Sequence, residues 1–344
     1  MKKLKFIVAA AVIAATAAMP AQAQLKLNGA GATFPYVIYS KWFDTYHTKT
    51  GIEFNYQSIG SGGGIKQVTE GTVDFGASDA MLTDAQLKEI ADKQGSPVLH
   101  IPTVMGAVVA MYHLPGFSGD LHLSPDVLAG IFLGEIQKWN DPKIAEINPG
   151  MTFPDMAIIV AHRSDGSGTS FIFTDYLTKV SKTWETKVGR GAAVNWPVGL
   201  GGKGNEGVAG LVKQSEGSIG YVELAYAVKN NLPFALLKNK SGNYVKASFD
   251  AVSAAAEGAV DNMPDDFRVM ITDQPGKDSY PISGFTWLLV YKSMKDKEKA
   301  GALVKFLHWA MEDGQSYAKD LYYAPLPREV VKLVEKKIST IETK

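Results

Sequence analysis

Residues 54–94 of this 344-residue chain read FNYQSIGSGGGIKQVTEGTVDFGASDAMLTDAQLKEIADKQ. Strand-like runs at 54–59 and 74–77 alternate in this stretch with helix-like runs at 65–70 and 84–94. Strands that alternate with helices at such spacing are typical of α/β proteins. The same alternation continues along most of the chain, so we expect an α/β fold.

The length of the chain indicates two domains, because about 320 residues beyond a leader exceed what one hydrophobic core usually organises. Two α/β lobes joined by crossing strands would leave a ligand cleft at the carboxyl ends of their strands. We expect the crossings near residues 100–105 and 280–285. The predicted division is lobe I, a discontinuous lobe of residues 24–102 and 283–344, and lobe II, residues 103–282. Residues 239–275 show weak periodicity and are expected to form surface loops.

The N-terminus has the pattern of a secretory signal. Three lysines among the first five residues precede an apolar run at 6–18 and the small-x-small sequence Ala21-Gln22-Ala23. The apolar run is too short to span a bilayer comfortably. We therefore expect a signal peptide over residues 1–23, cleavage near Ala23/Gln24 and a periplasmic location.

Composition limits the function classes. The chain has 35 basic and 35 acidic residues and no cysteine. The absence of cysteine excludes disulfides, cysteine nucleophiles and a thioether-lipid anchor on this chain. The balanced charge provides no global basic field, so nucleic acid is not an expected partner. Selectivity for an anion would have to come from a few local donors.

The run Arg163-Ser-Asp-Gly-Ser-Gly-Thr169 precedes a helix-like stretch at 170–180. It combines a cation, hydroxyls and flexible glycines at a helix start. Glycines let N–H groups converge, a helix N-terminus favours negative charge, and a guanidinium can bond two oxygens at once. The run is therefore a candidate oxyanion site. An ordinary strand-to-helix turn, capped by Ser167 or Thr169 and carrying a surface Arg–Asp pair, is the alternative.

Two further turns have the same strand-to-helix setting, at 29–35 (GAGATFP) and 59–64 (IGSGGG). A dinucleotide fingerprint would need glycine where Phe34 stands. Ser61 lacks the Gly-x-Ser-x-Gly pattern of a hydrolase and has no histidine nearby in sequence, so we expect its hydroxyl to donate a hydrogen bond rather than attack a substrate.

Asp79 follows the strand-like run 74–77 and offers an acceptor. Taken alone, an aspartate in this position is usually a helix cap or a turn residue. In an anion site, its carboxylate would accept a hydrogen bond from hydrogen phosphate, which keeps an acidic hydroxyl at neutral pH. Sulfate has no proton to give and would leave the carboxylate unpaired and repulsive.

Two other patterns carry no cofactor or metal prediction. The run 199–205 (GLGGKGN) fails as a nucleotide P-loop, because Pro197 and Gly204 stand where the motif needs glycine and a hydroxyl residue. We expect it to be a flexible loop on the cleft rim that caps a helix near Asn205. The six histidines form no close ligand pair. We expect neither metal nor cofactor.

Taken together, these segments make the chain similar to the periplasmic phosphate-binding proteins of phosphate-specific ABC transporters, a type II periplasmic-binding-protein family. The resemblance extends over essentially the whole chain beyond the leader. Its motifs stand at residues 29–35, 59–61, 73–79, 163–170, 196–204 and 217–222.

The resemblance implies a two-lobed α/β fold, an interlobe phosphate site and delivery of inorganic phosphate to an ABC importer. It also implies a non-enzymatic monomer that contacts membrane permease subunits directly and their ATPase indirectly. The implied phosphate-binding residues are Thr33, Phe34 through its backbone N–H, Ser61, Asp79, Arg163, Ser167, Gly168 and Thr169. Asp165 is implied as a support that orients Arg163. The chain departs from some relatives at Gly62, where they place a second serine.

Three alternatives remain open at this stage. A secreted phosphatase could use the same anion cradle, although the sequence offers no activated nucleophile or metal cluster. A receptor for sulfate, molybdate or tungstate could share the fold, although Asp79 argues against an unprotonated anion. A surface or adhesion role leaves no mark in such a sequence.

Overall fold

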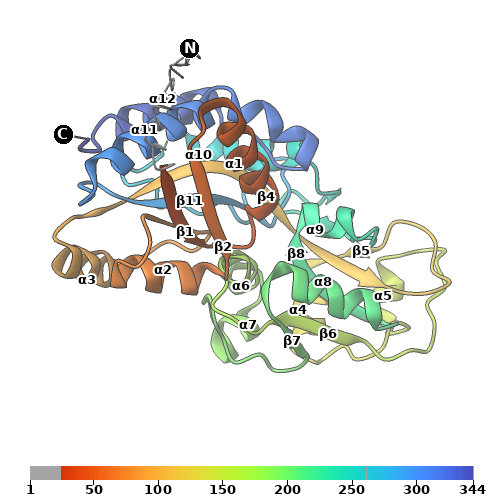
Figure 1. Ribbon diagram of the computed structural model, residues 1–344. Helices are drawn as coiled ribbons and strands as arrows, with labels where there is room; N and C mark the ends of the chain where they lie inside the picture. Colours follow the sequence, from red (N-terminus) through yellow and green to blue (C-terminus); the bar gives the residue numbers. More distant parts are fainter. Residues whose placement is uncertain (1–24, 261, 344) are drawn as a thin grey trace, which may run out of the picture.

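The computed structural model describes residues 25–260 and 262–343, which form two α/β halves built on one eight-stranded sheet (Figure 1). The predicted signal peptide lies outside the described residues. The strand order is β2-β1-β3-β11-β4-β8-β6-β7. The strands are β1 (Lys26–Gly31), β2 (Glu53–Ser58), β3 (Phe75–Ser78), β4 (Val98–His113), β6 (Ile159–Arg163), β7 (Leu200–Gly202), β8 (Ser218–Glu223) and β11 (Ser283–Tyr291). The α/β prediction is confirmed.

Strand β4 passes from one half into the other. Its residues 98–107 pair with β11, and its residues 108–113 pair with β8, both antiparallel. The strand is almost continuously apolar and is buried along nearly its whole length, as expected of a strand covered on both faces. The sequence predicted a crossing strand near residues 100–105, and β4 occupies that position.

The first half contains β1, β2, β3, β11 and the first part of β4. Strands β1, β2 and β3 are parallel, and an aromatic cluster that includes Phe43, Phe54 and Phe306 packs on one side. The helices packed against these strands are α1 (Tyr36–Thr50), α2 (Ser61–Glu70), α3 (Asp84–Gln94), α10 (Phe249–Val260), α11 (Lys297–Met311) and α12 (Arg328–Ile338), and the short 3-10 helices are η1 (Gly314–Tyr317) and η2 (Lys319–Leu321).

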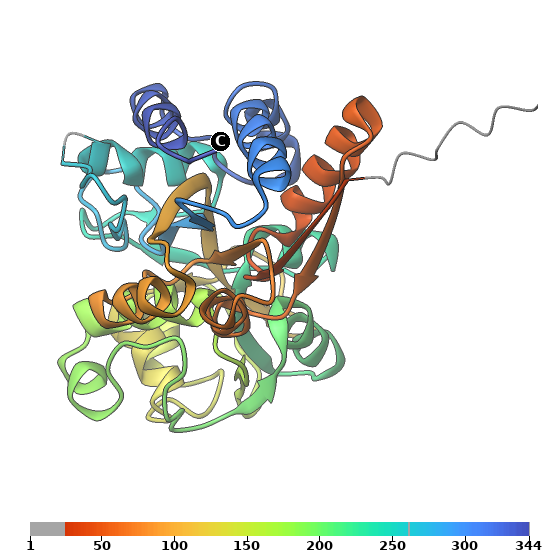
Figure 2. The same cartoon turned by 60° about the vertical axis from the view of Figure 1, so that its left-hand side comes forward.

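The second half contains the rest of β4 with β6, β7 and β8. Strand β6 is parallel to both β7 and β8, and the rings of Phe173 and Tyr221 stack at 4.3 Å between centroids. The helices of this half are α4 (Pro125–Phe132), α5 (Pro142–Glu146), α6 (Gly168–Val180), α7 (Lys182–Lys187), α8 (Gly204–Gln214) and α9 (Leu224–Lys229). A small sheet of β5 (His122–Leu123), β9 (Leu236–Lys238) and β10 (Tyr244–Val245) completes it. Figure 2 shows this yellow-to-green half below the red, orange and blue half.

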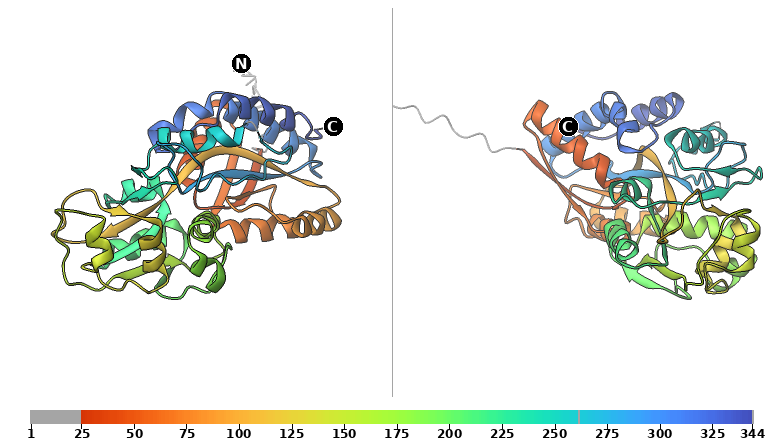
Figure 3. Two further views of the ribbon diagram at one scale, coloured as in Figure 1. Left: turned by 180° about the vertical axis from the view of Figure 1, so that it is seen from behind. Right: turned by 90° about the vertical axis from the view of Figure 1, so that its right-hand side faces the viewer.

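The expectation of surface loops over residues 239–275 is wrong for the segment that forms α10. This helix packs against β4 and β11 (Figure 3). It buries Ala251, Val252, Ala255 and Ala256. Its buried face is mostly alanine, which is an excellent helix former but gives a weak hydrophobic signal. The predicted division assigns α10 to lobe II, whereas its contacts are with strands of the first half.

No helix in the described ranges has the length and apolar character needed to cross a membrane.

Within each half, the parallel strands direct their carboxyl ends toward the line where the halves meet. The loops that follow β1, β2, β3 and β6 therefore face one another there, and these loops carry the motifs singled out in the sequence.

Candidate anion-binding site

The structure brings all the sequence-predicted site residues to the junction of the two halves. Thr33 and Phe34 lie between β1 and α1, Ser61 begins α2, and Asp79 follows β3 directly. From the second half, Arg163 ends β6 and Ser167 caps α6 by accepting the Ser170 N–H at 3.0 Å. The side chains among them are almost completely buried: Thr33, Phe34, Ser61, Asp79, Arg163, Ser167 and Thr169 are at most 3% exposed.

Ser61 joins the two halves at the centre of this region. Its Oγ accepts the backbone N–H of Asp79 at 3.2 Å and the backbone N–H of Gly168 at 3.1 Å. Beside it, the Gly62 N–H donates to the Gly166 carbonyl at 2.8 Å. The halves are therefore in direct backbone contact, as in a closed two-lobed binding protein.

Glycine is required at two of these contacts. A Cβ on Gly168 would lie 2.5 Å from both Asp79 Oδ2 and Ser61 Oγ. Gly60 has a φ of +87°, and a Cβ there would lie 2.2 Å from Asp165 Oδ2. The glycine-rich turns thus allow the close approach of the halves as well as the turn into each helix.

The two threonine hydroxyls of the site are held by one side chain. Asn205, at the start of α8, donates Nδ2 hydrogens to Thr33 Oγ1 at 2.7 Å and to Thr169 Oγ1 at 3.0 Å. Its backbone N–H also donates to Thr33 Oγ1, at 3.2 Å. Asn205 is completely buried. A helix begins near Asn205 as expected, but residues 200–202 form strand β7 rather than a loop.

Arg163 is fixed by Asp165 in a two-pronged ion pair. Its Nε and Nη2 donate to the two carboxylate oxygens at 2.8 and 2.6 Å, and its Nη1 donates to Thr169 Oγ1 at 3.3 Å. Burial alone would raise the pKa of Asp165, but the hydrogen bonds and charge of Arg163 outweigh burial and lower it. Two of the five guanidinium N–H groups remain for another acceptor.

Asp79 is the acceptor among these donors. Thr286 of β11 donates to its Oδ1 at 2.7 Å, while Oδ2 is buried without a hydrogen-bond partner in the described chain. Burial raises the pKa of Asp79 to about 7, and the Thr286 hydrogen bond and the Arg163 charge offset only part of that effect. Its Oδ2 lies next to Gly168 and Ser61.

The hydrogen bonds that three hydroxyl groups accept decide whether each can act as a donor or an acceptor toward a ligand. Ser61, Thr33 and Thr169 each accept two N–H donors, which occupy both lone pairs of the hydroxyl oxygen. Each O–H is thus left as a donor. Those of Thr33 and Thr169 have no acceptor in the described residues, whereas the Ser61 hydroxyl lies beside the Asp79 carboxylate and its hydrogen bond lowers the pKa of that group. The backbone N–H groups of Phe34 and Thr169 make no hydrogen bond within the described residues.

This set can bind a tetrahedral oxyanion that retains one proton. The hydroxyls, backbone N–H groups and guanidinium supply donors, and Asp79 supplies the acceptor. No group of three or more metal-ligating side chains lies within residues 25–260 and 262–343.

Several supporting residues escaped the sequence reasoning. Tyr226 and Tyr323 donate to the carbonyls of Thr33 and Phe34, both at 2.6 Å, and so fix the first loop. Asn205 and Thr286 orient the hydroxyls and the carboxylate. None of these four residues lies in a motif that indicates an anion site. Asn205 ends the glycine-rich run 199–205, which does not fit a nucleotide P-loop.

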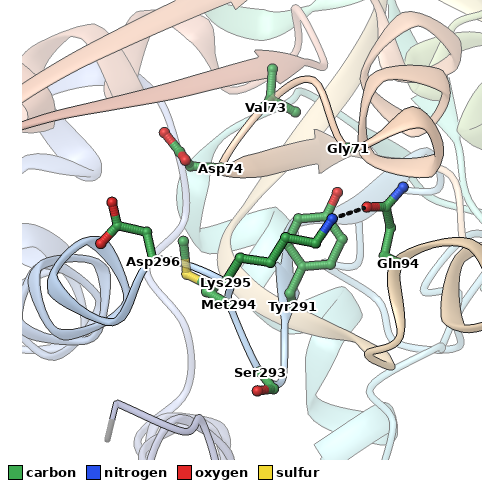
Figure 4. A pocket seen from close by; sticks show the side chains of 9 residues that line it. All are labelled: Gly71, Val73, Asp74, Gln94, Tyr291, Ser293, Met294, Lys295 and Asp296. Atoms are coloured by element: carbon green, nitrogen blue, oxygen red, sulfur yellow. Dashed lines mark hydrogen bonds between the residues drawn. The ribbon is translucent and has the colours of Figure 1, made fainter.

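A separate hollow lies beside the start of β3 and the end of β11 and is lined by nine residues that include Asp74 (Figure 4). Lys295 reaches across it and donates to Gln94 Oε1 at 3.4 Å. The Asp74 carboxylate is already paired with Lys299 and with the Asn28 N–H. Because the Asp74 carboxylate is already paired, this hollow has fewer free polar groups for a ligand than the junction of the halves.

Comparison with known proteins identifies the family of the chain. The model of the PBP superfamily domain matches residues 15–313. The phosphate-binding protein PstS of Pasteurella multocida is 46% identical over 326 residues, covering 94% of this chain and 93% of the relative. PstS of Xylella fastidiosa (strain 9a5c) is 45% identical over 312 residues, covering 90% and 84%.

Among solved structures, a high-affinity periplasmic phosphate-binding protein, PfluDING, bound with phosphate, matches with a TM-score of 0.72 and 23% identity, covering 91% of this chain and 93% of that one. This likeness supports the two-lobed fold. On the sequence relatives and the family model together, the chain belongs to the PstS phosphate-binding protein family within the PBP superfamily.

Proposed function

We propose that this chain is a receptor that captures inorganic phosphate between its two lobes and delivers it to an ABC importer. One observation carries the proposal. Three buried hydroxyl groups with both lone pairs occupied lie at the junction of the halves together with a buried carboxylate oxygen, Asp79 Oδ2, that has no hydrogen-bond partner. Such a set matches an anion that has several acceptor oxygens and one acidic hydroxyl.

The donors have distinct roles in this proposal. The hydroxyls of Thr33, Ser61 and Thr169 and the N–H groups of Phe34 and Thr169 bond the phosphate oxygens. Arg163 supplies the positive charge, and Asp165 holds its guanidinium in place. Ser167 and Gly168 shape the start of α6, whose N-terminus favours a negative charge.

Selectivity comes from Asp79. Its Oδ2 accepts a hydrogen bond from the hydroxyl of hydrogen phosphate. The buried carboxylate oxygen then has a hydrogen-bond partner. Sulfate would leave Oδ2 buried, charged and unpaired, and such a group is costly in a buried site. The same argument disfavours molybdate and tungstate, so phosphate is the ligand that fits best.

The relatives are named as phosphate-binding proteins. We extend that role, binding rather than catalysis, to this chain, since no hydroxyl of the site contacts a histidine that could activate it. We propose further that it acts as a monomer in the periplasm after removal of residues 1–23. Its partners are then the permease subunits of the importer, with the ATPase reached indirectly. A role for nucleic acid has no support in the charge of the chain.

Calorimetric titration of the chain from residue 24 onward tests this function. Phosphate should bind tightly with one-to-one stoichiometry at pH 7, and sulfate should give no heat of binding. If sulfate bound with an affinity equal to that of phosphate, the anion-binding site would be supported and the selectivity assigned to Asp79 would be wrong. If neither bound, the phosphate proposal would be wrong.

A further inference from the structure

Asn205 lies outside the set of residues predicted to bind the anion, yet it connects both threonine hydroxyls of the site. Thr33 belongs to the first half and Thr169 to the second, and the Nδ2 hydrogens of Asn205 reach one each, at 2.7 and 3.0 Å. One amide group therefore bridges the halves beside the anion site.

The orientation of this amide is fixed by a third partner. Asn205 Oδ1 accepts the backbone N–H of Glu223 at 2.9 Å. A backbone N–H cannot donate to the amide nitrogen, so the oxygen must face Glu223 and the nitrogen must face the threonines. The donor character of Asn205 toward both hydroxyls is thus set by its surroundings.

A fixed donor on one side of a hydroxyl decides where its hydrogen points. Thr33 Oγ1 also accepts the Asn205 backbone N–H at 3.2 Å, and Thr169 Oγ1 also accepts Arg163 Nη1 at 3.3 Å. With both lone pairs occupied, neither threonine can accept from a ligand, and both can only donate to it.

We propose that Asn205 is a positioning residue that makes Thr33 and Thr169 obligate donors to the anion. This deepens the proposed function and rests on it. Both bonds to Thr33 come from α8 of the opposite half, so its hydroxyl is fixed as a donor only when the halves meet. A phosphate must then turn unprotonated oxygens toward the two threonines and its hydroxyl toward Asp79.

A double-mutant cycle with inorganic phosphate tests this role. T33V and N205A should each weaken binding about tenfold, which corresponds to the loss of a hydrogen bond to a charged group. If Asn205 acts through the threonines, N205A should cost less than about threefold in the T33V background. Should N205A fail to fold, N205S, which keeps one hydroxyl donor, takes its place in the cycle.

The isosteric variant N205D replaces the hydrogen-bond donor at this position with an acceptor. A carboxylate would accept both threonine hydrogens and turn them away from the anion, so we expect a loss of more than about a hundredfold. N243D makes the same change of charge at an exposed turn and should bind as the unmodified chain does.

Two outcomes would overturn the inference while leaving the proposed function intact: wild-type affinity in N205A, and losses that simply add in the cycle. An unmodified chain that did not bind phosphate would instead overturn the proposed function, and this inference with it.

Discussion

Ser61 and Gly168 lie 107 positions apart in the chain and meet across the junction of the halves, where the Gly168 N–H donates to Ser61 Oγ at 3.1 Å. The first begins α2 and the second begins α6, so the bond joins two helix N-termini. Since both termini favour negative charge, this contact makes an anion between the halves a stabilising element of the closed state.

Gly168→Ala should prevent this closure. The added Cβ would lie 2.5 Å from Ser61 Oγ and Asp79 Oδ2, an overlap that forces the halves apart and should weaken phosphate binding at least about tenfold. Small-angle scattering should show the unmodified chain becoming more compact with phosphate and the variant remaining unchanged. Gly210→Ala, where a Cβ meets nothing within 4 Å, is the matched control and should close normally.

Arg163→Ala should abolish measurable high-affinity binding. The change removes the charged donor and leaves the Asp165 carboxylate, half-buried at the site, without its partner. Charged hydrogen bonds of this kind contribute about 1.5–3 kcal/mol each, so calorimetry should show a loss of at least about a hundredfold. Arg328→Ala removes the same charge from an exposed position at the start of α12 and should have no effect. Normal phosphate affinity in R163A would contradict the site assignment.

Asp79→Asn should relax the discrimination against sulfate. An amide can present an N–H to the anion, so the buried repulsion that excludes sulfate disappears. We expect sulfate binding to become measurable by calorimetry and phosphate binding to weaken by about tenfold. Asp250→Asn, at an exposed position on α10, controls for the change in net charge. Continued exclusion of sulfate by D79N would show that another feature selects the ligand.

The same variant should change the pH dependence of stability of the closed form, in which Asp79 is buried. Burial raises the pKa of Asp79 from 3.8 to about 7. The unfolded chain therefore releases this proton at lower pH, and the stabilising contribution is lost as pH rises from about 4 to about 7. Between pH 5 and 8, the free energy of unfolding should fall by about 2–3 kcal/mol more in the unmodified protein than in D79N. Urea unfolding at both pH values measures this difference, and equal pH dependence would contradict it.

The fold class was predictable because it depends on local pattern, and the residues proposed to face the ligand stay a prediction. Alternating strands and helices specified the α/β fold, and glycine-rich turns before helices marked the loops that carry Ser61 and Gly168. A carboxylate at a strand end drew attention to Asp79, and its role as acceptor came from the family resemblance. The division into lobes at residues 102/103 and 282/283 stays a prediction.

The supporting contacts were not predictable because they join distant parts of the chain. Asn205 reaches Thr33 over 172 positions, and Thr286 reaches Asp79 over 207. Each is an ordinary polar residue in its own segment, and only the pairing of the strands brings it to the site. The alanine face of α10 escaped for a different reason, since alanine contributes little to hydrophobic periodicity.

The course of β4 through both halves also has a consequence for folding. Its first part pairs Val98 with Tyr291, and its second part pairs His113 with Ser218. Neither partner strand lies close to β4 in the sequence, and pairing over such separations is slow because long loops must close first. The sheet of the first half therefore stays incomplete until β11 has been synthesised and has inserted between β3 and β4. Folding of the two halves is in this way coupled through one strand and depends on a segment near the end of the chain.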